Sequence, residues 1–200
     1  MKLIAWDFDG VLNRGYDGGF HLWQQSFEAD LGVSAAAFTR YMFGSDRFAI
    51  VLIGKRDLID LIADWIAADT VPHTPQAILT YWLQKDALLD EQVLDWQSRC
   101  PLPGVIATNN EAHRAGFIWN QLGFATRMQK IFASGSLGIR KPDAGFFEAI
   151  ERWSGLPPQE ILLIDDSDQN IAAARARGWQ VFHFTDETRT NLPAILGITP

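Results

Sequence analysis

Two aspartates near the start of the chain are placed where they could do chemistry. Asp7 and Asp9 have one residue between them in KLIAWDFDGVLNRG, directly after an apolar run and just before Gly10. Side chains alternate along a strand, so both carboxylates should point to one side and Phe8 to the other. Two close carboxylates repel each other unless one takes a proton or a cation lies between them. The spacing therefore predicts an acidic pair at the edge of the core that needs a proton or a cation.

Polar side chains also end other apolar stretches further along the chain. Thr108 ends one of them and is followed by Asn109. The pair Asp165 and Asp166 ends another. Lys141 lies in the segment GIRKPD, on a predicted loop just before a helix. Because ligands of open α/β sheets bind beyond the carboxyl ends of the strands, we expect these side chains at one edge of the molecule.

This collection of side chains suits phosphoryl transfer. Carboxylate oxygens at a helix start suit Mg²⁺, which completes its coordination with water and substrate phosphate. A lysine and a hydroxyl can stabilise the other side of a tetrahedral oxyanion. One carboxylate can attack phosphorus and form an aspartyl-phosphate, and a second can protonate the leaving oxygen and later deprotonate the attacking water.

The elements that must position these groups alternate between strands and helices. After the first apolar run, strands are predicted at 104–110, 130–135, 161–167 and 180–184, with amphipathic helices between them. Such alternation predicts a parallel α/β sheet with helices on both faces, a three-layer Rossmann-like core.

One part of the chain departs from this alternation. Residues 14–86 contain no convincing strand pair and several amphipathic helices. Ser34 is a plausible N-cap for one of them. We therefore expect a discontinuous core of residues 1–13 and 87–200, with residues 14–86 inserted as a helical domain.

Composition narrows the class of protein. Of 200 residues 48% are hydrophobic, which allows a substantial core, and the net charge of −7 argues against nucleic acid as a partner. No apolar run reaches the roughly 18–20 residues that span a membrane, and the first residues do not resemble a signal peptide. Cys100 is the single cysteine, so a reducing cytoplasm is the expected location. We expect a monomer or a small homo-oligomer with a small anionic substrate.

The order of the motifs resembles a known family. DFDGVL, a strand ending in threonine, KPD and IDDSDQN follow one another as do the four motifs of the haloacid-dehalogenase-like (HAD) hydrolase superfamily. The resemblance covers nearly the whole chain, and the insertion 14–86 is similar to the helical cap of the small-molecule phosphatases of that superfamily. Order, spacing and strand-end placement agree, whereas any one motif alone would be weak.

The resemblance implies a role for each motif residue. Asp7 would be the nucleophile and a Mg²⁺ ligand, and Asp9 the general acid/base, with its backbone carbonyl on the metal. Thr108 would bind a phosphoryl oxygen, assisted by the backbone N–H of Asn109. Lys141 would balance charge between Asp7 and the phosphoryl group.

The remaining assignments stay more open at this point. Asp166 would ligate the metal directly and Asp165 would support it, although the two could exchange roles and Asp168 is a third candidate. Asn170 is expected to cap the following helix. In the insertion, Arg47 could bind substrate, although a solvated helix face is the simpler explanation of its charge.

The function that the resemblance implies is a Mg²⁺-dependent phosphatase of a small phosphorylated metabolite, such as a sugar phosphate, acting through an aspartyl-phosphate. A sugar phosphomutase would use the same active-site set. A dehalogenase would not need the second acid, so Asp9 argues against it. A phospho-acceptor signalling module also combines aspartate, Mg²⁺, threonine and lysine, but it carries no helical insertion of this size. The simplest alternative for each motif taken singly is ordinary turn or surface chemistry.

Overall fold

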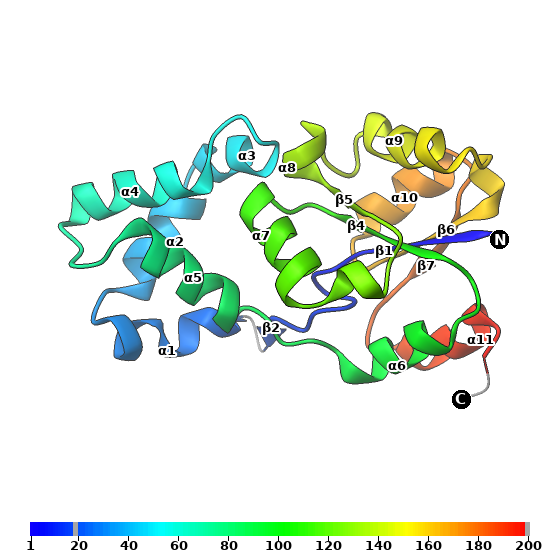
Figure 1. Ribbon diagram of the computed structural model, residues 1–200, viewed down its shortest axis with the longest axis horizontal. Coiled ribbons are helices and arrows are strands. Elements are labelled where there is room, and N and C mark those ends of the chain that lie inside the picture. Colours follow the sequence, from blue (N-terminus) through cyan, green and yellow to red (C-terminus); the bar gives the residue numbers. More distant parts are fainter. Residues whose placement is uncertain (18–19, 199–200) are drawn as a thin grey trace.

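The centre of the molecule is a parallel five-stranded sheet. The computed structural model describes residues 1–17 and 20–198. Its strands lie in the order β5-β4-β1-β6-β7, all parallel (Figure 1). Their bounds are Leu3–Trp6 for β1, Gly104–Thr108 for β4, Ile131–Ala133 for β5, Ile161–Asp165 for β6 and Gln180–His183 for β7. Every residue of β1, β4 and β6 is buried, as expected of central strands covered on both faces.

Alternating side chains of β1 supply both faces of the sheet. Leu3 and Ala5 pack into one hydrophobic cluster, and Ile4 and Trp6 pack into another on the opposite face. The first cluster is covered by α9 (Ala144–Ser154) and α10 (Asp168–Ala176). The second is covered by α6 (Glu91–Arg99), by α11 (Leu192–Leu196) and by the π-helix Phe117–Gln121, which continues α7 (Ala112–Gly116). The predicted three-layer α/β core is confirmed.

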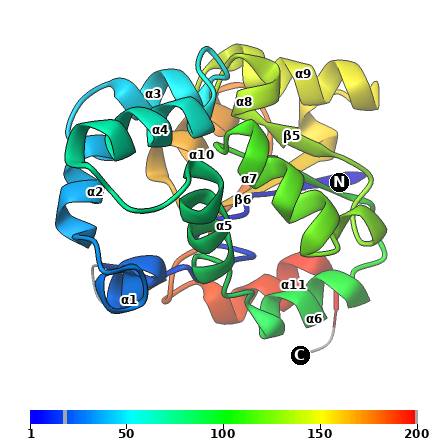
Figure 2. The ribbon, with the colours of Figure 1, turned by 60° about the vertical axis from the view of Figure 1, so that its left-hand side comes forward.

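Five helices between residues 22 and 85 pack on one another around a hydrophobic core of their own. They are α1 (Leu22–Leu31), α2 (Ala35–Phe43), α3 (Arg47–Leu52), α4 (Leu58–Asp69) and α5 (Pro75–Lys85). Ser34 caps α2 as predicted, because its hydroxyl accepts the N–H of Ala37. We call α1–α5 the helical module. It lies at the left in Figure 1, beyond the end of β1, and Figure 2 brings it forward.

Two chain segments connect the helical module to the sheet, and Asn13 joins them. Its amide Nδ2 donates to the carbonyl of Asp86 (2.9 Å), and its Oδ1 accepts the N–H of Leu88 (2.8 Å). A short hairpin of β2 (Tyr16–Asp17) and β3 (Phe20–His21) lies on the first segment. This hairpin was not predicted, since two-residue strands leave no alternation to detect. That residues 14–86 act as a separate domain stays a prediction.

The remaining elements are short. They are α8 (Ser134–Leu137) and the 3₁₀ turns Phe124–Thr126, Pro158–Glu160 and Arg189–Asn191. Across the described residues, no helix combines the length and the apolar character needed to traverse a bilayer.

Candidate active site

Asp7 follows the last residue of β1 and lies in a strongly charged, buried setting. It is 8% exposed. One carboxylate oxygen accepts the N–H of Phe8 (2.7 Å), and the other lies 3.0 Å from Nζ of Lys141. Burial raises the pKa of Asp7 well above its usual value, and the nearby carboxylates Asp165 and Asp166 raise it further, against the opposing effect of Lys141. Phe8 points the other way, into the core beside Phe124.

Lys141 connects Asp7 to the end of β6. Its side chain is fully buried, and Nζ lies 2.6 Å from Oδ2 of Asp165. Burial alone would lower the pKa of Lys141, but Asp7 and Asp165 outweigh it and raise that pKa, so the ammonium stays charged. Asp165 also accepts the backbone N–H of Ser167 (2.9 Å) and the amide of Asn170 (3.0 and 3.2 Å). These contacts make Asp165 the group that holds Lys141 in place.

The expected capping role of Asn170 is wrong. Ser167 is the N-cap of α10, and its hydroxyl accepts the backbone N–H of Asn170. The side chain of Asn170 is thereby placed against Asp165 instead. A capping amide and an amide that orients a carboxylate have the same sequence signal, since both stand at the start of a helix.

Carboxylate oxygens of Asp7, Asp165 and Asp166 lie within 4.8 Å of one another, which is a spacing that suits a cation. The side chain of Asp166 passes over Gly10 to reach this place. Gly10 has a backbone φ of +82°, and a Cβ there would lie 2.2 Å from Oδ2 of Asp166. Burial, and then the charge of Asp165, raise the pKa of Asp166. Hard oxygens in this arrangement fit Mg²⁺. Because Asp165 is engaged by Lys141 and two amide N–H donors, Asp7 and Asp166 are the better ligand candidates.

Asp168, the third metal candidate of the sequence, lies apart from this cluster. Its side chain is 91% exposed and its Oδ1 is 3.4 Å from Nδ1 of His183. It belongs to the first turn of α10, where an acidic side chain complements the helix dipole.

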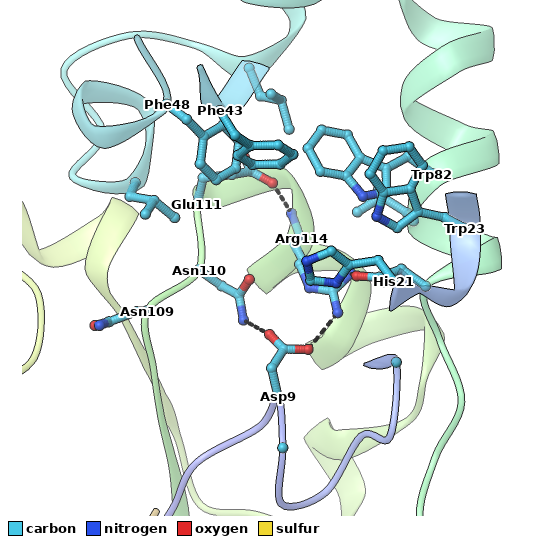
Figure 3. Close-up of a pocket in the computed structure, with 16 residues that line it drawn as sticks. Asp9, His21, Trp23, Phe43, Phe48, Trp82, Asn109, Asn110, Glu111 and Arg114 are labelled. Atoms are coloured by element: carbon cyan, nitrogen blue, oxygen red, sulfur yellow. Dashed lines mark hydrogen bonds and ion pairs between the residues drawn. The ribbon is translucent and has the colours of Figure 1, made fainter. Parts of the chain in front are cut away.

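Asp9 lies in the same loop as Asp7 and is held by three donors, of which Figure 3 shows Arg114 and Asn110. Its Oδ1 accepts from Arg114 (2.6 Å) and Asn13 (3.0 Å), and its Oδ2 accepts from Asn110 (2.8 Å). Burial opposes ionisation of Asp9, but Arg114 and the two amides outweigh it and lower its pKa. Arg114 also pairs with Asp86 (2.7 Å), the residue that follows α5. Arg114 thus connects Asp9 to the end of the helical module.

Thr108 and Asn109 complete the edge of the sheet. The hydroxyl of Thr108 accepts from Asn110 (2.7 Å), so its own proton is available to an anion. The amide of Asn109 donates to the carbonyl of Lys141 (2.9 Å) and accepts its N–H (2.8 Å). Asn109 therefore fixes the loop that carries Lys141, and any contact with substrate would come from its backbone.

Apart from the weaker candidate Asp168, the structure brings all but one of the predicted site residues together. Arg47 is the exception: its guanidinium stacks 4.8 Å from the ring of Tyr41 and donates to the carbonyl of that residue (3.4 Å). Arg47 does not line either of the two cavities beside Asp9. The contact with α2 explains why, because it holds the side chain against the helical module.

Two cavities meet at Asp9. One is lined by the catalytic candidates at the sheet edge, Asp7, Thr108 and Asp166 among them. The other, of about 240 Å³, lies between the helical module and α7. Asp9 and Asn109 line both.

Sequence reasoning missed Arg114 and Asp86. An arginine in a short helix and an aspartate after a helix are each common on protein surfaces, so neither stands out by type or spacing. Their contact joins positions 28 residues apart, at 86 and 114, and it depends on how the helical module meets the core.

Comparison with known proteins places the chain in one family. The model of the family described as haloacid dehalogenase-like hydrolase matches residues 1–178. A HAD family enzyme from Bacteroides thetaiotaomicron, solved in complex with magnesium and inorganic phosphate, has a TM-score of 0.76 at 16% identity, over 96% of this chain and 98% of that chain. At this identity the likeness concerns the fold.

Two curated proteins share shorter stretches of sequence. Drimenol cyclase of Aspergillus calidoustus is 36% identical over 74 residues, which are 36% of this chain and 14% of that protein. A sesquiterpene phosphatase of Aspergillus oryzae is 38% identical over 60 residues, which are 30% of this chain and 31% of that protein. The match spans less than a third of the length of either relative.

Proposed function

The chain belongs to the haloacid dehalogenase-like hydrolases, and on that premise we propose that it is a Mg²⁺-dependent phosphatase that acts through an aspartyl-phosphate on Asp7. The observation that carries the proposal is the pairing of two aspartates in different environments. Asp7 lies against Lys141 and the acidic end of β6, whereas Asp9 lies 2.6 Å from Arg114 at the mouth of a second cavity. A nucleophile and a separate proton carrier are what hydrolysis of a phosphate ester needs.

In the first step Asp7 attacks phosphorus. An oxygen of Asp7 forms a bond to the phosphorus atom while the bond from phosphorus to the leaving oxygen breaks. Asp9 gives its proton to that leaving oxygen, so the product is an alcohol. Lys141 and the hydroxyl of Thr108 stabilise the negative charge on the phosphoryl oxygens.

In the second step water replaces the aspartyl oxygen. Asp9, now ionised, takes a proton from the water, and the water oxygen attacks phosphorus as the bond to Asp7 breaks. Inorganic phosphate leaves and both aspartates return to their starting state. Arg114 lowers the pKa of Asp9 and so keeps its carboxylate ionised and free to accept the proton of the water, and the phosphoryl charge of a bound substrate raises that pKa for the acid role.

The residues around Asp7 fit a divalent cation. Asp7, Asp166 and the backbone carbonyl of Asp9 would hold Mg²⁺, with Asp165 orienting Lys141 beside it. Bound there, Mg²⁺ would offset the charge of the carboxylates and of the phosphoryl group. Solved relatives with magnesium and phosphate, and a curated relative named a phosphatase, support this proposal. The helical module would act as the cap over the site.

Loss of the nucleophile tests the proposal. Asp7→Asn is expected to lower turnover of p-nitrophenyl phosphate to background, because a neutral side-chain amide cannot form the acyl phosphate. EDTA should silence the natural protein, and added Mg²⁺ should restore it. Release of inorganic phosphate measures both effects, with circular dichroism as the check that the variant is folded. A folded Asp7→Asn protein with normal turnover would contradict the mechanism.

A further inference from the structure

The cavity beside Asp9 on the side of the helical module has an aromatic wall. Trp23, Phe43, Phe48 and Trp82 come from α1, α2, α3 and α5 and line it together (Figure 3). The ring of Trp82 lies 5.9 Å from Phe43, 5.9 Å from Phe48 and 5.5 Å from Trp23, so the four rings form one surface. Phe43 is 40% exposed and lines this cavity. We call this cavity the aromatic pocket.

The polar residues opposite the aromatic wall already bind one another. Arg114 is held by Asp9 and Asp86, and Asn110 donates to Asp9. The carboxylate of Glu111 accepts two backbone N–H groups at the start of α7 (2.6 and 2.7 Å). A sugar carries several hydroxyls, and each buried hydroxyl needs a hydrogen-bond partner. Among the described side chains here Oδ1 of Asp86 is buried without a partner and could accept one hydroxyl, but pairing several hydroxyls would compete with the contacts that already hold Asp9, Arg114 and Glu111.

The charge of the aromatic pocket disfavours a second phosphate. Asp9, Asp86 and Glu111 are acidic, and the basic side chains among the described residues that line it are His21 and Arg114, of which Arg114 is paired twice. A second phosphoryl group would meet carboxylates there at close range. A bisphosphate, which a sugar phosphomutase must hold, is therefore a poor fit.

The size and position of the aromatic pocket suit the leaving group of the substrate. Asp9, Gly10, His21 and Asn109 line both this pocket and the cavity around Asp7. With the phosphoryl group at Asp7, the group beyond the leaving oxygen would pass Asp9 into the aromatic pocket. An apolar cavity of about 150 Å³ holds benzene, so by the same ratio the 240 Å³ here corresponds to roughly ten carbon atoms.

We propose that the aromatic pocket binds an apolar leaving group of roughly ten carbons or fewer, so that the substrate is the monophosphate ester of a hydrophobic alcohol rather than a sugar phosphate. The inference rests on the phosphatase activity proposed above and adds the class of substrate to it. Its physical basis is burial of hydrocarbon against the four rings, with the alcohol oxygen left beside Asp9.

A series of primary alkyl monophosphates tests the proposal on the natural protein. Ethyl, butyl, hexyl and octyl phosphate have the same charge and similar leaving-group basicity, so they differ chiefly in apolar surface. We expect kcat/KM to rise about fourfold for each added methylene until the pocket is full. Glucose 6-phosphate, also the ester of a primary alcohol, should react no better than ethyl phosphate. A flat series, or glucose 6-phosphate reacting faster than hexyl phosphate, would overturn the proposal.

Two matched variants locate the effect. Phe43 and Ile50 are apolar side chains with nearly equal exposure, 40% and 41%, and only Phe43 lines the aromatic pocket. Phe43→Ser should reduce the dependence of kcat/KM on chain length by at least half, and Ile50→Ser should keep the slope of the natural protein. Equal slopes in both variants would place the apolar contact elsewhere and overturn the assignment to this pocket.

Failure of the pocket and failure of the phosphatase give different results. If all alkyl phosphates are hydrolysed at one rate, the phosphatase stands and the aromatic pocket has lost its assigned role. If none is hydrolysed, the proposal of a phosphatase fails. The affinity for ethyl, hexyl and octyl phosphonate, measured by calorimetry in the presence of Mg²⁺, then tests the pocket by itself. Affinity that rises with chain length supports it, and affinity without such a trend overturns it.

Discussion

At the scale of single residues, the two aspartates of the loop after β1 differ because of their neighbours. Asp7 faces a buried lysine and two further carboxylates, and its pKa is raised by burial. Asp9 faces Arg114 and two amides, and its pKa is lowered. Two identical side chains with one residue between them are thereby given separate roles, as the proposed nucleophile and the proposed proton carrier.

Asp9→Asn should separate the two chemical steps. p-Nitrophenolate leaves without needing a proton, so attack by Asp7 should still release it in the variant. Hydrolysis of the aspartyl-phosphate needs the base, so it should slow by about 10²–10⁴-fold. We expect a burst of p-nitrophenol close to one equivalent per enzyme, followed by a stalled reaction, in stopped-flow absorbance.

An alkyl phosphate provides the control for that experiment. Its leaving oxygen needs a proton, so Asp9→Asn should show no burst with butyl phosphate. If the variant turns over either substrate at the rate of the natural protein, Asp9 has no role in proton transfer.

The sequence predicted which side chains lie at the site where those side chains stand at the end of a predicted strand. Asp7, Thr108 and Asp166 each stand at such an end, and the structure places them at one edge of the sheet. The sequence left the role of Arg47 open, because a six-residue helix has too few turns to show which face meets its neighbours. Arg114 was missed because its partners come from other parts of the chain.

At the scale of elements, the central strands were predictable because they are short, apolar and fully buried. Every residue of β1 and β4 is buried, so the apolar run and the strand coincide. The π-helix Phe117–Gln121 could not be predicted, since five residues are too few to show its longer period. It widens the helix after α7.

Helix α6 depends on a buried ion pair at its start. Asp90 is its N-cap, accepting the N–H of Val93 (3.1 Å), and it also binds Arg189 through two contacts of 2.5 Å. Burial opposes ionisation of Asp90, but Arg189 and that N–H outweigh it and lower its pKa below the usual 3.8. The ionised form is therefore the one that stabilises the fold.

Asp90→Asn should lower the free energy of unfolding by about 3 kcal/mol at pH 7, because it leaves Arg189 without its charged partner while keeping a capping oxygen. The folded pKa lies below the unfolded one, so the contribution is complete above about pH 5. It is lost as the pH falls through 3.8 toward the folded pKa. Urea unfolding of both proteins from pH 7 to pH 3 should show two curves that converge at acid pH.

Asp95→Asn on the same helix is the control. Asp95 pairs with Arg99 on the surface, where its side chain is 58% exposed. Its loss should change the free energy of unfolding by less than about 0.5 kcal/mol. A difference between natural protein and Asp90→Asn that does not shrink at low pH would show that packing, not charge, stabilises the start of α6.

At the scale of the whole molecule, the site depends on how the helical module meets the core. Ser134 of α8 donates its hydroxyl to the carbonyl of Leu52 at the end of α3 (2.6 Å). Gly54, two residues later, lies so close to α8 that a Cβ there would be 2.2 Å from the carbonyl oxygen of Gly135. Gly54 was visible in the sequence, but its partner 81 residues away was not, since no local pattern encodes a contact between the helical module and the core.

Gly54→Ala should therefore weaken activity through the position of the helical module. The residue has φ of +67°, which costs a non-glycine residue about 1–2 kcal/mol, and the methyl group would also push α3 and α4 away from α8. Gly32→Ala isolates the first effect, because Gly32 has φ of +65° with no atom within 4 Å of its Cβ position. We expect thermal unfolding to show similar backbone penalties in both variants and a further loss of stability in Gly54→Ala. The kcat/KM for hexyl phosphate should fall at least tenfold in Gly54→Ala, whereas Gly32→Ala should match the natural protein. Equal kcat/KM in the two variants would mean that the contact between Gly54 and α8 is absent from the catalytically competent form, and that the aromatic pocket is completed in some other arrangement of the module and the core.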